Sequence, residues 1–276
     1  MYSTLMVHLE PDNDNASLLN ITGDLAERFD ADVIGIAACQ TAMLVIGDGV
    51  GSAAFVERDQ AEIKKKMGRT EKAFHEALQH RSPHLEWRST ETYGAPTEYI
   101  VRQMRSADLL ITGVNHRGSW LDPTWRVDTG DLVMQAGRPV LIVPSVARHL
   151  LARTILVAWK DTRETRRALS DALPLLKTAK RAIVVEVVTS EEAIAEGRKN
   201  VQDVADWLER HDVSAEPLVR SADDEVAPPL GLIAQQEGAD LVVAGAYGHT
   251  RLREWVLGGV TRNLLSDTNL CSLLSH

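Results

Sequence analysis

The stretch Asp240-Leu-Val-Val-Ala-Gly-Ala-Tyr-Gly248 joins an apolar run to a glycine-containing turn. The run has the length and composition of a buried parallel strand. After nine intervening residues come Gly258-Gly-Val-Thr261, which open a short amphipathic helix expected at residues 260–265. Glycines at a strand end and at a helix start let backbone N–H groups approach a ligand, and the helix N-terminus adds partial positive charge. The pattern therefore favours binding of a phosphate group.

An internal repeat surrounds this stretch. Residues 93–143 align without a gap with residues 225–275 at one offset, so that Gly113 corresponds to Gly245 (245 − 113 = 132). A repeat of this length indicates duplicated domains, because the units of a solenoid are shorter.

The starts of the two copies also correspond. Residues 4–8 lie over residues 154–158 at an offset of 150 (154 − 4 = 150). The difference of 18 between the two offsets (150 − 132 = 18) fits extra loop in the first copy. We therefore expect two domains, at residues 1–147 and 152–276, because a chain of 276 residues is longer than an average domain.

Each copy is expected to alternate strands with helices. Strands are expected at residues 5–9, 33–38, 85–92, 109–112, 140–143, 154–159, 182–188, 213–219, 241–244 and 271–274. Helices are expected at residues 16–28, 55–80, 97–105, 129–136, 162–178 and 191–210, and another is expected to start near 223–229. This alternation predicts an α/β fold, in which each copy has a five-stranded parallel sheet covered on both faces. Ligands of such sheets bind beyond the carboxyl ends of the strands, where the strand order reverses.

Composition excludes several classes of protein. The formal charge of −9 and the pI of about 5.5 argue against a nucleic-acid surface, and Lys64-Lys-Lys66 is interpreted as a solvated helix face. The chain has no apolar stretch of roughly 20 residues, so no membrane span is expected, and its start lacks the basic segment of a signal peptide. Cys39 and Cys271, the only cysteines, are interpreted as small buried apolar residues. We therefore expect a cytoplasmic protein.

Three features together resemble the universal stress protein family in its tandem form: the spacing Gly-x2-Gly-x9-Gly, its position after a fourth strand, and the duplicated five-stranded unit. The resemblance covers essentially the whole chain. It implies an adenine-nucleotide α-hydrolase-like, Rossmann-like fold in each half, with the halves related by a pseudo-twofold axis. In this family the fifth strands commonly pair at a dimer interface, so residues 140–143 and 271–274 are expected to pair within one chain.

The resemblance also implies an ATP site in the second half, with or without magnesium. Its residues would be Trp159, Lys160, Asp161, Val187, Gly245, Gly248, His249, Arg251, Gly258, Gly259, Val260 and Thr261. Two positions depart from the family. Gly259 replaces a Ser or Thr, and Lys160 replaces an acidic residue that contacts the nucleoside. An ammonium cannot accept a hydrogen bond, so Lys160 could pair with a phosphate while Asp161 acts as the acceptor, or Lys160 could be a solvated charge.

The first half has lost the glycine pattern, and only Gly113 survives. Bulky residues, His116, Arg126 and Val127, stand where the other glycines would be. Such side chains argue against ATP at this position, although Arg117 and Arg126 could attract another anion. We interpret the first half as a pseudo-site.

Other kinds of site have weaker support. His75, His80 and His84 have spacings that do not keep all three on one helical face, so no metal site is expected. His249 is interpreted as a phosphate contact or an exposed loop residue and not as a catalytic group, and no Gly-x4-Gly-Lys-Ser/Thr motif occurs. The expected function is that of a nucleotide-responsive stress regulator with an unknown protein partner, as a monomer with an internal pseudo-dimer or as a homodimer. The alternatives are a slow ATP hydrolase or phosphotransferase, and a nucleotide-free interaction module.

Overall fold

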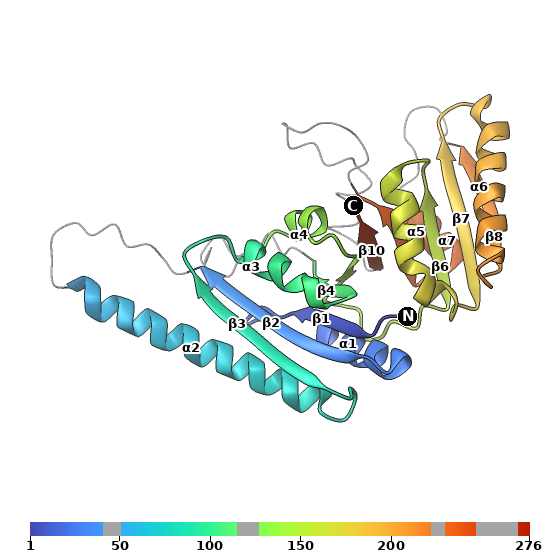
Figure 1. Ribbon diagram of the computed structural model, residues 1–276. Helices are drawn as coiled ribbons and strands as arrows, with labels where there is room; N and C mark the ends of the chain where they lie inside the picture. Colours follow the sequence, from blue (N-terminus) through green and yellow to red (C-terminus); the bar gives the residue numbers. More distant parts are fainter. Residues whose placement is uncertain (41–50, 115–126, 222–229, 247–269) are drawn as a thin grey trace.

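The structure is a computed structural model that describes residues 1–40, 51–114, 127–221, 230–246 and 270–276; of residues 51–57 and 59 it describes the backbone alone. The first half contains β1 (Thr4–His8), α1 (Ala16–Phe29), β2 (Asp32–Gln40), α2 (Gly51–Leu78), β3 (Leu85–Thr92), α3 (Pro96–Gln103), β4 (Leu109–Gly113), α4 (Thr129–Gln135) and β5 (Val140–Val143) (Figure 1). The second half contains β6 (Thr154–Trp159), α5 (Arg163–Leu176), β7 (Arg181–Val188), α6 (Ala193–Glu209), β8 (Ala215–Ser221), α7 (Leu230–Glu237), β9 (Leu241–Gly245) and β10 (Cys271–Ser275).

All ten strands form one sheet, in the order β3-β2-β1-β4-β5-β10-β9-β6-β7-β8. Within each half the neighbouring strands are parallel, whereas β5 and β10 pair antiparallel, with Leu141 opposite Leu273. The expected α/β class, the duplication and the pairing of the two fifth strands are thereby confirmed. Because β5 and β10 cover each other's open edges, β3 and β8 are left as the two edges of the sheet.

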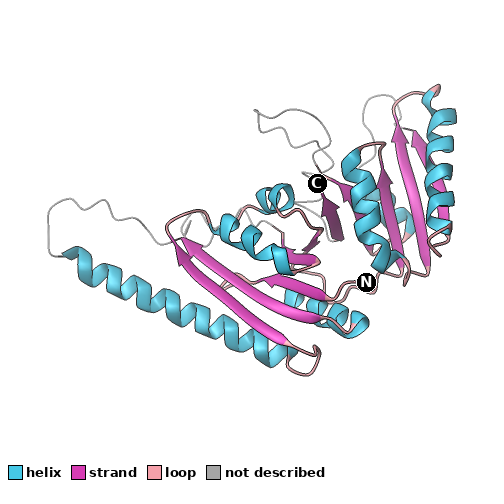
Figure 2. Cartoon of the chain, in the orientation of Figure 1, coloured by secondary structure: helices cyan, strands magenta, loops and turns pink. Residues whose placement is uncertain are grey.

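The helices cover both faces of the sheet (Figure 2). Buried side chains of α1, α2, α5 and α6 pack with one face in a single core that runs through both halves, and those of α3, α4 and α7 pack with the other. Strand residues alternate between the two cores: Leu5 and Val7 of β1 face the first, and Met6 faces the second. The apolar runs predicted as strands are apolar throughout because both faces of the sheet are buried.

Helix α5 also joins the two halves. The Tyr2 hydroxyl donates to the backbone carbonyl of Asp171 at 2.6 Å, and the Asp171 carboxylate accepts a hydrogen bond from Ser275 at 2.9 Å. One turn earlier, Arg167 donates to the Gly137 carbonyl of the first half at 2.6 Å. The interface therefore has a polar component beside the β5–β10 pair.

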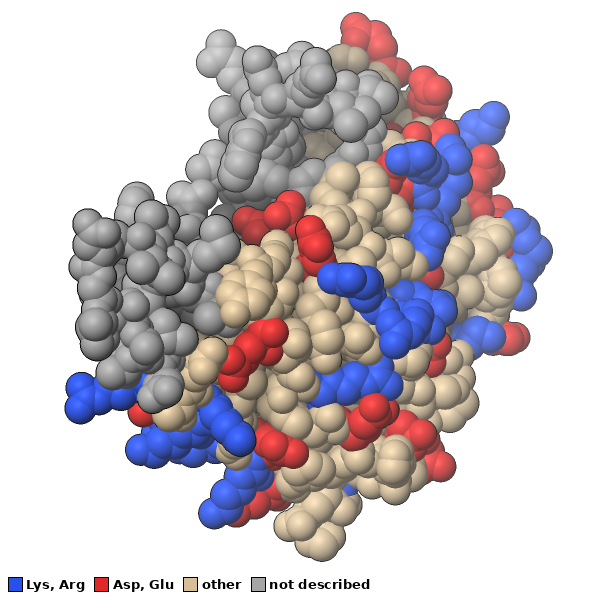
Figure 3. All heavy atoms as spheres, turned by 60° about the vertical axis from the view of Figure 1, so that its left-hand side comes forward, with Lys and Arg blue, Asp and Glu red and all other residues tan. Residues whose placement is uncertain are grey.

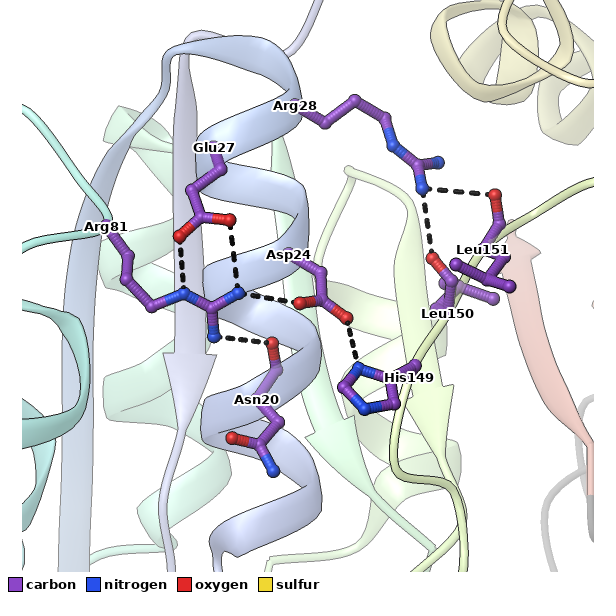
Figure 4. Close-up of polar contacts among 8 residues, drawn as sticks. All are labelled: Asn20, Asp24, Glu27, Arg28, Arg81, His149, Leu150 and Leu151. Atoms are coloured by element: carbon purple, nitrogen blue, oxygen red, sulfur yellow. Dashed lines mark hydrogen bonds and ion pairs between the residues drawn. The ribbon is translucent and has the colours of Figure 1, made fainter.

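The segment between β5 and β6 is attached to α1 (Figure 4). Arg28 donates to the carbonyls of Leu150 and Leu151 at 3.1 and 3.0 Å, and His149 Nδ1 lies 3.1 Å from the Asp24 carboxylate. The Leu150 side chain is buried in the first core. These contacts hold the connection against the first half.

Arg81 organises the other side of α1 (Figure 4). Its guanidinium group contacts the carboxylates of Glu27 and Asp24 at 2.7 and 2.6 Å and donates to the Asn20 carbonyl at 3.3 Å. A side chain at Gly23 would lie 2.2 Å from this guanidinium group. Glycine at this position therefore makes room for the arginine.

The bounds of several expected elements differ from the structure; the helix expected at 55–80, for example, is α2, Gly51–Leu78. The strand expected at 213–219 is β8, Ala215–Ser221, because the Val213 N–H donates to the Leu208 carbonyl and belongs to the turn that closes α6. The helix expected at 97–105 ends as α3 at Gln103 and continues as a short 3-10 turn, Met104–Ser106.

Candidate functional site

The carboxyl ends of β6, β7 and β9 meet at one edge of the sheet in the second half. The chain leaves β6 toward β7 on one side, whereas β9 lies on the other side of β6, so the strand order reverses between β6 and β9. Ligands of open α/β sheets bind beyond such a reversal. Of the predicted site residues, the structure places Trp159, Lys160, Asp161, Val187 and Gly245 at this edge.

Gly245 lies directly against the first turn of α5. A Cβ atom at Gly245 would lie 2.5 Å from the backbone nitrogen of Thr165 and 2.7 Å from the carbonyl carbon of Glu164. Real Cβ atoms do not approach backbone that closely, so this contact requires glycine. At the corresponding position of the first half, the nearest atom to a Cβ on Gly113 would be Leu18 Cδ1 at 3.9 Å. Close helix packing is thus a property of the second half.

The start of α5 presents ordered polar groups beside Gly245. Thr162 caps the helix by accepting a hydrogen bond from the Thr165 N–H. Glu164 is buried. Burial raises the pKa of Glu164, but hydrogen bonds from Arg163, its own N–H and Thr162 outweigh it and bring the pKa below the ordinary value. Glu164 is therefore a buried, ionised carboxylate next to the site, and the sequence analysis missed it.

Asp161, considered above as an acceptor for a nucleoside, already has a partner. Its carboxylate accepts from Arg166 at 2.6 and 3.2 Å, and both side chains are largely exposed. The neighbouring Lys160 is exposed, and its carbonyl accepts from the Thr162 N–H at 2.6 Å. The acceptor role of Asp161 and the phosphate role of Lys160 stay predictions.

The two expected lining residues face opposite sides of the sheet. Trp159 is in register with Glu186 and packs against the core under α5 and α6, whereas Val187 packs against the other core. The Trp159 indole N–H is buried without a hydrogen-bond partner in the described part of the chain. Burial raises the pKa of Glu186, although a hydrogen bond from Asn200 lowers it. The structure therefore does not bring Trp159 and Val187 together.

The remaining predicted site residues lie outside the described residues; they are Gly248, His249, Arg251, Gly258, Gly259, Val260 and Thr261. The same is true of His116, Arg117 and Arg126 in the first half. The chain on either side of residues 247–269 is anchored. The Ala246 N–H donates to the Ser275 carbonyl at 2.9 Å, and His276 Nδ1 lies 3.0 Å from the Ala246 carbonyl.

The corresponding edge of the first half contains a buried polar pair. His8 Nδ1 lies 3.1 Å from the Thr112 hydroxyl, and both side chains are buried. Burial lowers the pKa of His8 to about 4, so the imidazole is neutral at physiological pH. By the repeat offsets, these positions correspond to Ala158 and Ala244 (8 + 150 and 112 + 132). The pair occupies space that the second half leaves to two methyl groups.

The face drawn in Figure 3 has no basic patch, and the described residues form no metal centre. Figure 3 shows Lys and Arg interspersed with Asp and Glu on one face. Within the described ranges, no group of three or more His, Cys, Asp or Glu residues could hold a metal ion. No described helix is long and apolar enough to cross a membrane. Cys39 and Cys271 are both free and buried, as expected.

Comparison with solved structures supports the fold over nearly the whole chain. A universal stress protein from Archaeoglobus fulgidus superposes with a TM-score of 0.75, covering 99% of this chain and 97% of that one, at 12% identity. A functionally unknown protein from Pseudomonas aeruginosa superposes with a TM-score of 0.61, covering 99% and 92%, at 15% identity. At these identities the likeness concerns the fold alone.

Sequence comparison finds a similarity to one protein family. The family model described as "Universal stress protein family" matches residues 152–270. A universal stress protein of Methanocaldococcus jannaschii is 43% identical over 37 residues, which are 13% of this chain and 23% of that protein. The chain thus spans less than a quarter of the length of this curated relative. Residues 152–270 therefore match the universal stress protein family, within a fold that is duplicated along the chain.

Proposed function

We propose that the second half binds ATP at the carboxyl edge of β6, β7 and β9, and that the protein is a nucleotide-responsive regulator in a stress response. The observation that carries this proposal is the position of Gly245, the first glycine of the motif. It lies against the first turn of α5 with no room for a side chain. The first glycine of the motif, the N-terminus of α5 and a strand-order reversal therefore lie together in the segment that matches the family.

Different residues of the chain would contact different parts of the nucleotide. Backbone N–H groups of Gly259, Val260 and Thr261 would donate to the phosphates, and Lys160 would neutralise part of their charge. Asp161 would accept from the nucleoside through Oδ2, since both contacts from Arg166 go to Oδ1. No residue is assigned a catalytic role, so the proposed activity is binding.

Calorimetric titration with ATP, ADP and AMP, with and without magnesium, tests the proposal. We expect heat with at least one nucleotide, and its loss in Gly258→Trp, because an indole would occupy the phosphate position. Arg126→Ala in the first half is the control and should bind as the unchanged protein does. No heat and no thermal shift with any of the three nucleotides would refute the proposal.

One observation favours a nucleotide-free interaction module as a second candidate. Arg166 already donates to Oδ1 of Asp161, and a lysine precedes Asp161 in place of the family's acidic residue. Absorbance near 260 nm after denaturation of the purified protein separates the two, since only a binder releases nucleotide. A slow ATP hydrolase would instead release phosphate and lose that activity in Gly248→Val.

A further inference from the structure

The two edge strands of the sheet differ in how well they are protected. β8 contains Pro217, in register with Val184 of β7, and a proline on an edge strand lacks the N–H that another strand would need. β3, at the opposite edge, contains no proline in Leu85–Thr92. Its outer backbone is therefore able to pair with an additional strand.

The register of β3 identifies the backbone groups that face outward. The Val33 N–H of β2 donates to the His84 carbonyl at 2.9 Å, so the even-numbered residues of β3 direct their backbone groups toward β2. The odd-numbered residues direct theirs away from the sheet. Among these, Ser89 and Glu91 are exposed, which places an accessible N–H and C=O at the middle of the edge.

A groove runs between this edge and α2. It has a volume of about 470 Å³ and is lined by Lys64, Met67, Gly68, Glu71, Ser89, Thr90 and Glu91. Figure 3 brings the side of the molecule that carries α2 forward. A strand added to β3 would extend the sheet beside this groove.

Gly68 has no close neighbour among the described residues of its own chain. It is exposed in the middle of the long helix α2, and no described heavy atom lies within 4 Å of the position of a Cβ. Glycine in a helix interior costs about 1 kcal/mol relative to alanine. Glycine is otherwise used where a second backbone approaches closely, so Gly68 indicates the approach of another helix to this side of α2.

Lys64 and Glu71 lie on either side of Gly68 along the helix and carry opposite charges. Both line the groove. In the described part of the chain, neither side chain takes part in an ion pair, since the ion pairs of α2 are made by Lys66, Arg69 and Lys72. The pattern of positive, small and negative residues is self-complementary when two such helices lie antiparallel.

We propose that β3 and this side of α2 form an interface with a second copy of the chain. The two β3 strands pair antiparallel about a twofold axis at Ser89, and the two α2 helices lie side by side with Gly68 at their closest approach. The arrangement fits the dimensions, because a helix about 10 Å wide covers about two strands. Lys64 then faces the partner subunit's Glu71 at two symmetric places. Along the strands, Arg88 faces the partner's Thr90 and Trp87 faces the partner's Glu91, so no like charges meet.

Analytical ultracentrifugation over a range of concentrations tests the interface. We expect dimers for the unchanged protein. Ser89→Pro should raise the dissociation constant about a hundredfold, because symmetry removes two hydrogen bonds of about tenfold each. Ser89→Ala keeps the N–H and is the matched control. The β2–β3 ladder is unaffected by the proline, since the Ser89 N–H points away from β2.

Charge exchange on α2 tests the same interface without touching the sheet. Lys64→Glu places two carboxylates opposite each other at both symmetric places and should dissociate the dimer. The double variant Lys64→Glu/Glu71→Lys restores opposite charges and should restore it. Gly68→Arg, which meets no atom of its own chain, should also dissociate it. A monomer at every concentration of the unchanged protein would overturn the proposal, as would a dimer insensitive to Ser89→Pro and to both charge variants.

Discussion

The buried His8–Thr112 pair makes the stability of the protein depend on pH in a definite direction. Burial lowers the pKa of His8 from the ordinary 6.5 to about 4. An unfolded chain takes up a proton at this imidazole below pH 6.5, whereas the folded protein does not until about pH 4. The contribution of His8 to stability is therefore complete above pH 6.5 and is lost progressively as the pH falls toward 4.

The magnitude follows from the two pKa values. The difference between 6.5 and about 4, at about 1.4 kcal/mol per pH unit, corresponds to about 3 kcal/mol of unfolding free energy. That is a large part of the total stability of an ordinary domain, which is about 5–15 kcal/mol. The effect should be visible because His8 is only 2% exposed and solvent screens it little.

Urea unfolding at several pH values between about 7 and about 4.5 measures this contribution. The double variant His8→Leu/Thr112→Val removes the imidazole and its hydroxyl partner together, so that no buried polar group is left unpaired. We expect the variant to lose about 2–2.5 kcal/mol less stability over this range than the unchanged protein, because the full effect is reached only below pH 4. His80→Gln, a change at an exposed histidine, is the control and should keep the original pH dependence. Equal pH dependence in the double variant and the unchanged protein would refute the reasoning.

Three further changes test the packing. Gly245→Ala should destabilise the protein by about 2–3 kcal/mol in thermal unfolding, because its Cβ would lie 2.5 Å from the backbone of α5. Gly113→Ala is the control and should leave the stability nearly unchanged, because the nearest described atom to its Cβ would be at 3.9 Å. Ser272→Val should raise the unfolding free energy by about 1 kcal/mol, because the buried Ser272 hydroxyl has no hydrogen-bond partner among the described residues and the matching residue of the first half is Val140. An unchanged or lower value would contradict this account. Arg81→Ala should cost about 1–2 kcal/mol by removing the ion pairs on α1; a neutral result would show that the pairs contribute nothing.

The architecture was predictable from sequence because its signals are long and repeated. Eight apolar runs and two more polar strands, separated by amphipathic segments, leave little choice but a parallel sheet covered on both faces. The fixed offset between the copies, seen at Gly113 and Gly245, predicts that both halves have the same order of strands and helices. The antiparallel pairing of β5 with β10 then closes two edges that each half would leave open.

The side-chain partners at the candidate site were not predictable in the same way. Whether Asp161 faces a ligand or Arg166 depends on where the first turn of α5 lies, and no periodicity encodes that position. Trp159 and Val187 fall on opposite faces because the register of β6 against β7 pairs Trp159 with Glu186. The buried state of Glu164 likewise depends on the approach of α5 to Gly245. Alternation fixes faces within one strand but not the pairing between strands.

The two halves of the duplicated fold differ at the carboxyl ends of their strands but stay equivalent where β5 pairs with β10. Strand pairing at β5 and β10 uses backbone groups and apolar side chains, which both copies retain. The carboxyl ends of the strands do not pair the two halves, so their side chains are free to differ. In the first half His8 and Thr112 occupy positions where the second half has Ala158 and Ala244. Because the polar pair is satisfied internally, this substitution keeps the core intact. Loss of the glycine pattern in one copy is therefore compatible with full retention of the fold in both.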